Sequence, residues 1–277
     1  MPSIGPILVA DLMPKVEWSL LELLRSLTAE DWERQTVAPR WKVKDVAAHL
    51  LDTQLRKLSM VRDSYAAETP NIQSPADLAT FINRLNDEGV RIYRRLSPAV
   101  LISLLEVASR ESCDFHLSLN PFAPAAFSVS WAGELQSLNW FDNARELTER
   151  WHHQQQIRLA TGRPGIVTPE LYHPVLDCFM RALPHRFRDV AAAPGTMLAV
   201  EVSGDSGGTW FLLRTDERWM LSEISTVPLT GRVVIPEEFA WRIFTKGLHR
   251  DAVEQVVRIE GDRDLAHHVL DMTAIVG

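Results

Sequence analysis

The chain has 277 residues, of which 46% are hydrophobic and 23% charged, and its formal net charge is −7. This composition is typical of an ordinary globular protein with one large or two ordinary domains. The negative balance argues against nucleic-acid binding, which needs clustered Lys and Arg, and we interpret the interleaved charges as solvated helix faces.

The N-terminal segment has no basic leader, and Asp11 and Pro14 interrupt its short apolar stretch. A signal peptide is therefore not expected, and no apolar run approaches the length of a membrane span. The two cysteines, Cys113 and Cys178, are too few for a disulfide framework or a cysteine-based zinc ribbon. These features predict a soluble cytoplasmic protein without a membrane partner, and they leave a monomer and a homodimer both open.

Apolar residues recur at helical spacing through most of the first 160 residues. Thr28 with Asp31 resembles a capping segment, and the pairs Ser74-Pro75 and Ser97-Pro98 are typical of helix starts. Thr161-Gly162-Arg163-Pro164-Gly165 is a strong stop signal. Helices are expected over residues 7–27, 42–65, from 75 onward, 98–119 and 138–160, with a loop over 120–136.

Beyond residue 165 the pattern changes to alternating apolar segments. Strands are expected over 197–202 and 209–214, with further strands over 218–222 and 231–235 and helices over 237–247 and 263–274. The sequence thus predicts a mainly α protein. A helical bundle with a four-helix core, residues 1–165, is followed by a smaller α+β domain, residues 170–277.

Residues 204–208, Gly-Asp-Ser-Gly-Gly, spell the nucleophile motif of chymotrypsin-like proteases and would pair Ser206 with His49. That protease fold is an all-β double barrel, whereas His49 lies within a predicted helix. Between two predicted strands, the same residues are what a flexible hairpin turn requires. We therefore interpret Ser206 as a turn residue.

His49 lies in the second predicted helix among small apolar neighbours, where it is either a buried, hydrogen-bonded core residue or a ligand. Glu149 and His153 stand at i and i+4, which places both on one helix face within reach of a single ion. Together these three residues would bind a metal and leave positions open for water or substrate. Zinc is favoured, with nickel or iron(II) as alternatives. The Glu–His pair could equally be a surface pair, and His152 or Glu146 could replace a ligand.

Aromatic and amide residues offer further candidates. Trp18, Trp32 and Trp41 are expected to pack the bundle. Trp151, beside the proposed ligands, either belongs to the core or lines a cofactor pocket. Gln156 falls on the ligand face, where it could orient a ligand or a bound water, or it faces solvent.

Residues 41–50, W-K-V-K-D-V-A-A-H-L, are similar to the W-x-V-x-D-V-x-x-H-L signature of DinB-like proteins. The closest resemblance is to the mycothiol-dependent maleylpyruvate isomerase group, whose entry segment and second-domain closing segment resemble residues 27–32 and 261–266. The resemblance implies a DinB-like bundle followed by that family's second domain. It also implies a metal bound by His49 together with the Glu and His of the E-x-x-x-H on the last bundle helix, here Glu149 and His153.

The resemblance further implies an enzyme whose metal holds a low-molecular-weight thiol, such as mycothiol, as a thiolate that attacks an unsaturated or electrophilic small molecule. Isomerisation or thiol transfer would result. In the family an arginine near the end of the second domain's helix lies over the metal pocket, and residues 241–247 here offer Arg242 or Lys246 as an anion clamp. The alternatives are a non-catalytic metal-binding or stress-responsive DinB-like protein, and a metal-assisted hydrolase.

Overall fold

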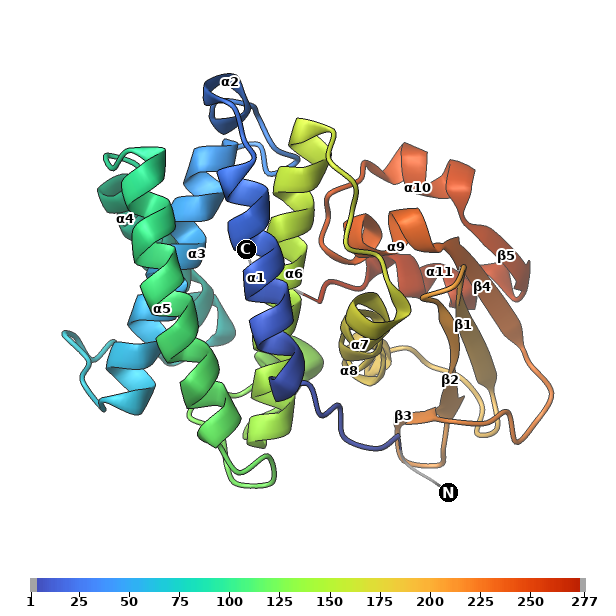
Figure 1. Ribbon diagram of the computed structural model, residues 1–277. Coiled ribbons are helices and arrows are strands. Elements are labelled where there is room, and N and C mark those ends of the chain that lie inside the picture. Colours follow the sequence, from blue (N-terminus) through green and yellow to red (C-terminus); the bar gives the residue numbers. More distant parts are fainter. Residues whose placement is uncertain (1–3, 275–277) are drawn as a thin grey trace. The chain divides into compact units, whose positions relative to one another are not determined.

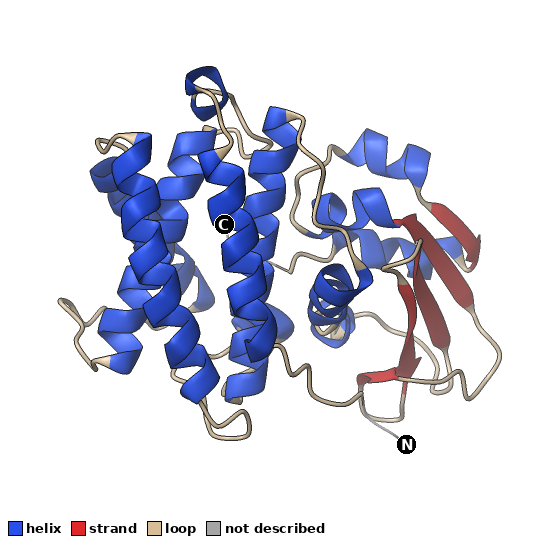
Figure 2. Cartoon of the chain, viewed as in Figure 1, coloured by secondary structure: helices blue, strands red, loops and turns tan. Residues whose placement is uncertain are grey.

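The computed structural model describes residues 4–274, which form two compact units. The helical unit comprises residues 8–126 and 138–166, and the second unit comprises residues 4–7, 127–137 and 167–274. All strands of the described chain lie in the second unit (Figure 2). The predicted mainly α protein with a small C-terminal sheet is confirmed. No helix among residues 4–274 is both long and apolar enough to cross a membrane.

The helical unit is built around four long helices, α1, α3, α5 and α6, with α4 packed against α3 (Figure 1). Its elements are η1 (Ala10–Leu12), α1 (Met13–Arg25), α2 (Ala29–Trp32), α3 (Val43–Lys57), the π-helical turn η2 (Leu58–Arg62), α4 (Pro75–Tyr93), α5 (Pro98–Ser118) and α6 (Asn139–Thr161).

The helix boundaries follow the capping chemistry of the sequence. Thr28 accepts a hydrogen bond from the Asp31 N–H at 3.2 Å, and the Asp31 carboxylate accepts one from the Thr28 N–H at 3.1 Å. Ser74 and Ser97 cap α4 and α5 in the same way, each accepting from a first-turn N–H. Gly162, with φ +65°, ends α6 in the left-handed conformation that glycine adopts most readily. These predicted termini are confirmed.

The apolar stripe of α1 faces a core that also contains Trp32, with Trp41 packed at its edge. Trp18, however, is 63% exposed, so the prediction that it packs the bundle is wrong. At 100° per residue Trp18 lies about 200° around α1 from Val16, which is fully buried. The inward stripe therefore leaves Trp18 on the solvent side.

Helix α4 approaches α3 closely at Gly89. A Cβ at this position would lie 2.2 Å from Cγ of Asp52. Burial raises the pKa of Asp52, which nevertheless has a partner because Arg56 contacts its carboxylate at 2.7 Å. Arg56 also donates to Oδ1 of Asn86 on α4 at 2.6 Å. The close approach at Gly89 and the Arg56–Asn86 hydrogen bond thus join the two helices, while the Arg56–Asp52 ion pair lies within α3.

The second unit contains a five-stranded sheet in the order β3-β2-β1-β4-β5, in which only the β1–β4 pair is parallel. Figure 1 shows its helices gathered on one face of the sheet. Its elements are η3 (Ser130–Ala132), α7 (Pro169–Met180), α8 (Leu183–Phe187), β1 (Met197–Ser203), β2 (Gly208–Arg214), β3 (Trp219–Ser222), β4 (Gly231–Pro236), α9 (Glu237–Phe244), α10 (Arg250–Val256), β5 (Arg258–Gly261), α11 (Arg263–His267) and η4 (His268–Asp271).

The four expected strands are present, whereas α7, α8, α10 and β5 were not predicted, and the last helical segment ends at Asp271. The turn between β1 and β2 holds Ser206, whose hydroxyl donates to the carbonyl of Val167 at 3.0 Å. A Cβ at Gly207 would lie 1.9 Å from the carbonyl oxygen of Val202, so the turn requires glycine there. Ser206 is a turn residue, as expected.

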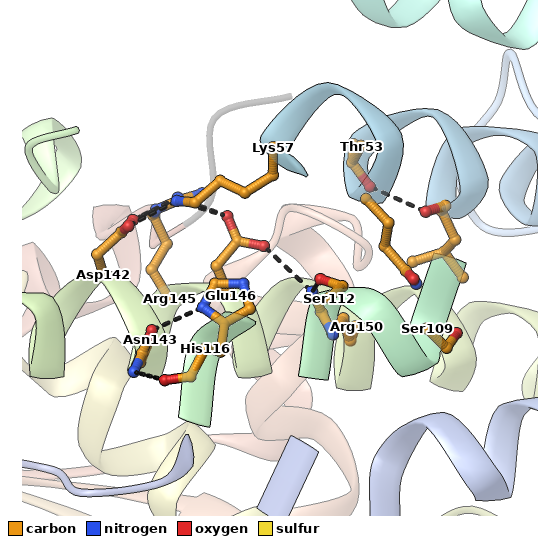
Figure 3. A network of polar contacts seen from close by, with 12 residues as sticks. Thr53, Lys57, Ser109, Ser112, His116, Asp142, Asn143, Arg145, Glu146 and Arg150 are labelled. Atoms are coloured by element: carbon orange, nitrogen blue, oxygen red, sulfur yellow. Dashed lines mark hydrogen bonds and ion pairs between the residues drawn. The ribbon is translucent and has the colours of Figure 1, made fainter. Parts of the chain in front are cut away.

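A network of charged side chains lies inside the helical unit (Figure 3). Lys57, at the end of α3, contacts Asp142 at 2.5 Å and Glu146 at 3.4 Å, and Arg145 contacts the same two carboxylates. Burial raises the pKa of Asp142 and of Glu146, but the neighbouring cations outweigh it, and both pKa values lie below their usual range. Both carboxylates are therefore ionised.

The network continues toward α1 through Arg150. Its guanidinium donates to Glu17 at 3.0 Å and to the Ser112 hydroxyl at 2.7 Å, and it lies 3.8 Å from Glu146. Gln54 donates to the same Glu17 oxygen at 3.0 Å. The interpretation of the charges as solvated helix faces is wrong for this set, because these side chains lie inside the helical unit. The set holds equal numbers of opposite charges: Lys57, Arg145 and Arg150 pair with Glu17, Asp142 and Glu146.

Replacing Lys57 with Met should reduce the free energy of unfolding by about 3–5 kcal/mol, because it leaves a buried excess of negative charge. Urea unfolding of the two proteins measures the difference. The double variant Lys57→Met/Glu146→Gln restores equal numbers of opposite charges and should recover part of the loss. A double variant no more stable than the single one would contradict charge balance as the cause. Lys42→Met, which breaks an exposed pair with Glu33, should change little.

His116 should make stability depend on pH. Burial, helped by the charge of Arg150, lowers the pKa of His116 from 6.5 to about 4, while its Nδ1 lies 2.7 Å from Oδ1 of Asn143. Between these values the unfolded chain binds more protons, so stability falls as the pH falls, by up to about 1.4 kcal/mol per pH unit for this residue. His116→Gln should have a shallower slope in urea unfolding between about pH 6.5 and pH 5. An unchanged slope would show that His116 is not the group responsible.

Candidate metal centre

Four polar residues of α6 recur at the spacing of one helix face. Glu149, His152, His153 and Gln156 stand at i, i+3, i+4 and i+7, so their side chains project in the same direction. The two imidazoles and the Gln156 amide are buried, and Glu149 keeps partial exposure. This face therefore presents one carboxylate and two imidazoles to the interior of the helical unit.

The donor atoms of Glu149, His152 and His153 lie within 4.8 Å of one another, and among the described residues they form the one group of this kind. Nε2 of His153 lies 3.4 Å from Oε2 of Glu149. Such spacing suits a single cation bound at this helix face, since imidazole nitrogen and carboxylate oxygen both ligate zinc at about 2 Å.

His49 reaches the same place from α3. Its ring centroid lies 4.7 Å from that of His153 and 4.6 Å from that of Trp41. The residue is 5% exposed, and its buried Nδ1 has no hydrogen-bond partner. Burial, with the neighbouring His153, lowers the pKa of His49 well below its usual value. His49 is therefore held as the neutral imidazole that metal binding requires.

Gln156 connects the two α6 histidines. Its Oε1 lies 3.0 Å from Nδ1 of His153, and its Nε2 lies 3.1 Å from Nε2 of His152. Gln156 is therefore a buried residue that contacts a predicted ligand, and it does not face solvent. The amide fills a position from which it can orient both imidazoles.

The other candidates lie elsewhere. Trp151 is fully buried, and its indole N–H donates to the carbonyl of Ile166 at 3.0 Å. Glu146, considered as a substitute ligand, belongs to the charged network with Lys57. Arg242 and Lys246 belong to the second unit, where the Arg242 guanidinium lies over the Phe239 ring. The sequence predicts His152 only as a substitute ligand, although its i+3 spacing from Glu149 places it on the same helix face.

The donor set fits a divalent cation of the zinc, nickel or iron(II) kind. The imidazoles of His49 and His153 and the carboxylate of Glu149 supply borderline nitrogen donors and one negative charge. The unpartnered Nδ1 of His49 supports the fit, because a buried polar atom without a partner is uncommon in a folded protein.

Comparison with known sequences adds a family. Residues 16–158 match the model described as the mycothiol maleylpyruvate isomerase N-terminal domain. Two uncharacterized proteins of Mycobacterium tuberculosis, one from each of two strains, are both 27% identical over 215 residues, covering 74% of this chain and 76% of theirs. Their descriptions assign no activity.

Solved structures share the fold. A crystal structure of the mycothiol-dependent maleylpyruvate isomerase has a TM-score of 0.53 at 11% identity, covering 84% of this chain and 86% of that one. The structure of a histidine-to-alanine mutant of such an isomerase has a TM-score of 0.54 at 10% identity, covering 91% of both chains. At these identities the likeness shows the fold alone.

The family match covers residues 16–158, which is more than half of the chain and includes His49, Glu149 and His153. The relationship predicted from the segment at 41–50 is therefore confirmed. The chain belongs to the family of the mycothiol maleylpyruvate isomerase N-terminal domain.

Proposed function

We propose that this protein binds a divalent cation through His49, Glu149 and His153 and uses it to hold a low-molecular-weight thiol of the mycothiol class. The observation that carries the proposal is the convergence of these side chains from α3 and α6 within the matched domain. A bound divalent cation lowers the pKa of a coordinated thiol and so supplies a thiolate nucleophile at neutral pH. Zinc is the favoured metal, with nickel or iron as alternatives.

The chain's own thiols favour an external nucleophile. Burial raises the pKa of Cys113 to about 11, so this thiol is protonated at neutral pH. Cys178 is fully buried. Reactive cysteines are accessible and have lowered pKa values. Neither cysteine has that character, which supports a separate thiol as the reacting sulfur.

Neighbouring side chains restrict the orientation of the proposed ligands. Trp41 packs against the rings of His49 and His153, with centroids 4.6 and 5.8 Å away, and so restricts how both imidazoles can turn. Glu149 supplies the negative charge of the set, and its side chain keeps partial exposure, so we propose that the centre opens to solvent beside Glu149. Three protein ligands leave at least one coordination position for a thiol.

The substrate class follows from the family name and from the solved structures, which belong to isomerases of maleylpyruvate. We propose an unsaturated or electrophilic small molecule as substrate. Addition of the thiolate to a double bond followed by its departure would give isomerisation and regenerate the thiol. Protonation of the adduct with retention of the new C–S bond would instead give thiol transfer. Arg242 or Lys246 is proposed as the clamp for an anionic group.

His49→Ala and His153→Ala should each lose the bound metal. Each substitution removes one of three proposed protein ligands, and such a site depends on all of them. The measurement is elemental analysis of untagged protein purified without chelator, and we expect about one equivalent in the wild type. The control is His249→Ala, at an exposed histidine far along the chain, which should retain the metal. Folded ligand variants that retain wild-type metal content would refute the site.

Thiol affinity should depend on the metal. Titration of metal-loaded protein with mycothiol should show binding that disappears after chelation and in His49→Ala, because the cation is the proposed point of attachment. Metal-independent binding would contradict the proposal. Metal binding without thiol affinity would favour the non-catalytic metal-binding alternative, and ester or amide hydrolysis without added thiol would favour the hydrolase.

A further inference from the structure

We infer that Gln156 is a positioning residue that holds His152 outside the coordination sphere while presenting His153 to the cation. The inference rests on the proposed function, since it takes His49, Glu149 and His153 as the ligands. One side-chain amide thereby determines how many protein side chains coordinate the cation.

The hydrogen bonds of Gln156 fix the tautomer of each histidine. An amide oxygen only accepts, so Nδ1 of His153 must carry the proton that it donates to Oε1 at 3.0 Å. Nε2 of His153 then keeps its lone pair, and this is the atom that lies 3.4 Å from Glu149. The contact therefore selects the tautomer in which His153 can ligate through Nε2.

The other end of the amide has the opposite effect. The nitrogen Nε2 of Gln156 only donates, so Nε2 of His152 accepts at 3.1 Å, and its lone pair is occupied. His152 nevertheless belongs to the group of donors that lie within 4.8 Å of one another. Without Gln156 that lone pair would be available, and His152 could become a fourth protein ligand.

The number of ligands determines whether a thiol can bind. Metal sites with four protein ligands are closed and structural, whereas catalytic sites keep a position for water or substrate. The helix spacing places His152 beside Glu149 and His153, so distance alone does not keep His152 from coordinating the cation. Gln156 keeps His152 from coordinating, and neither an ionised Glu nor a Leu at this position could both accept from His153 and donate to His152.

Co(II) substitution tests the inference, because cobalt ligand-field bands report the donor set directly. We would load wild type and Gln156→Leu with Co(II), record visible spectra, and titrate each protein with 2-mercaptoethanol. The wild type should develop a thiolate-to-cobalt charge-transfer band. Gln156→Leu should show shifted ligand-field bands before thiol is added, and a charge-transfer band that is lost or needs roughly tenfold more thiol.

Two variants separate this effect from general disruption. His152→Leu alone should keep the wild-type cobalt spectrum and thiol band, because His152 is not a ligand when Gln156 is present. His152→Leu/Gln156→Leu should regain the thiol band that Gln156→Leu loses. Gln155→Leu, at a buried glutamine of the same helix outside the donor group, is the matched control and should resemble the wild type.

Each outcome decides the question. A wild-type spectrum and thiol band in Gln156→Leu, or a changed cobalt spectrum in His152→Leu, overturns the inference while leaving metal binding intact. Failure of the wild type to bind Co(II) refutes the proposed function itself. If Gln156→Leu does not fold, the spectrum of His152→Leu still decides whether His152 is a ligand.

Discussion

The contact between α3 and α6 is the constraint on which the candidate centre depends. Lys57, near the end of α3, meets Asp142, near the start of α6, and His49, two turns earlier on α3, lies beside His153. The two helices therefore run antiparallel, with the ion pair near one end of the contact and the imidazoles about two turns further along α3. Eight residues of α3 separate the two contacts, roughly 12 Å at 1.5 Å per residue. Any slip in the ion pair would move the imidazoles apart.

Electrostatics divide the interior of the helical unit into two zones. In the network around Lys57, each buried charged side chain has an oppositely charged side chain beside it. Around His49 and His152, burial and mutual proximity instead favour neutral imidazoles. Neutral imidazoles have free lone pairs for a cation, so the zone around His49 can bind one. In the zone around Lys57 the carboxylates are already paired with Lys and Arg side chains. The same helix, α6, contributes to both.

The sequence was sufficient where local chemistry decides the structure. Three short-range features lie where the sequence predicts them: the capping residue Thr28, the helix stop at Gly162, and the i, i+4 pair of Glu149 and His153. The role of that pair as metal ligands stays a proposal. The resemblance of residues 41–50 added His49, which spacing alone could not connect to α6.

What could not be predicted depends on contacts between distant segments. Lys57 and Arg150 look like ordinary surface charges in the sequence, because their ion-pair partners Asp142 and Glu17 are distant along the chain and meet them only in the packed bundle. Helix α7 is apolar on most sides and contains Pro174, so it lacks a clear helical period. Strand β5 has four residues, mostly exposed, and too little pattern to be recognised. Trp18 was misplaced because hydrophobicity alone does not say which side of a helix faces the core.

Gly89 has a consequence for how relatives of this chain can diverge. The carboxylate of Asp52 occupies the space that a side chain at position 89 would need. A larger residue at 89 is thus compatible with the α3–α4 contact only if the Asp52 carboxylate turns away or position 52 becomes smaller, and either change disturbs the ion pair with Arg56. Positions 52, 56 and 89 should therefore covary among family members, as residues in direct contact do. Natural variation at these three positions would serve as a record of how close the two helices lie in each relative.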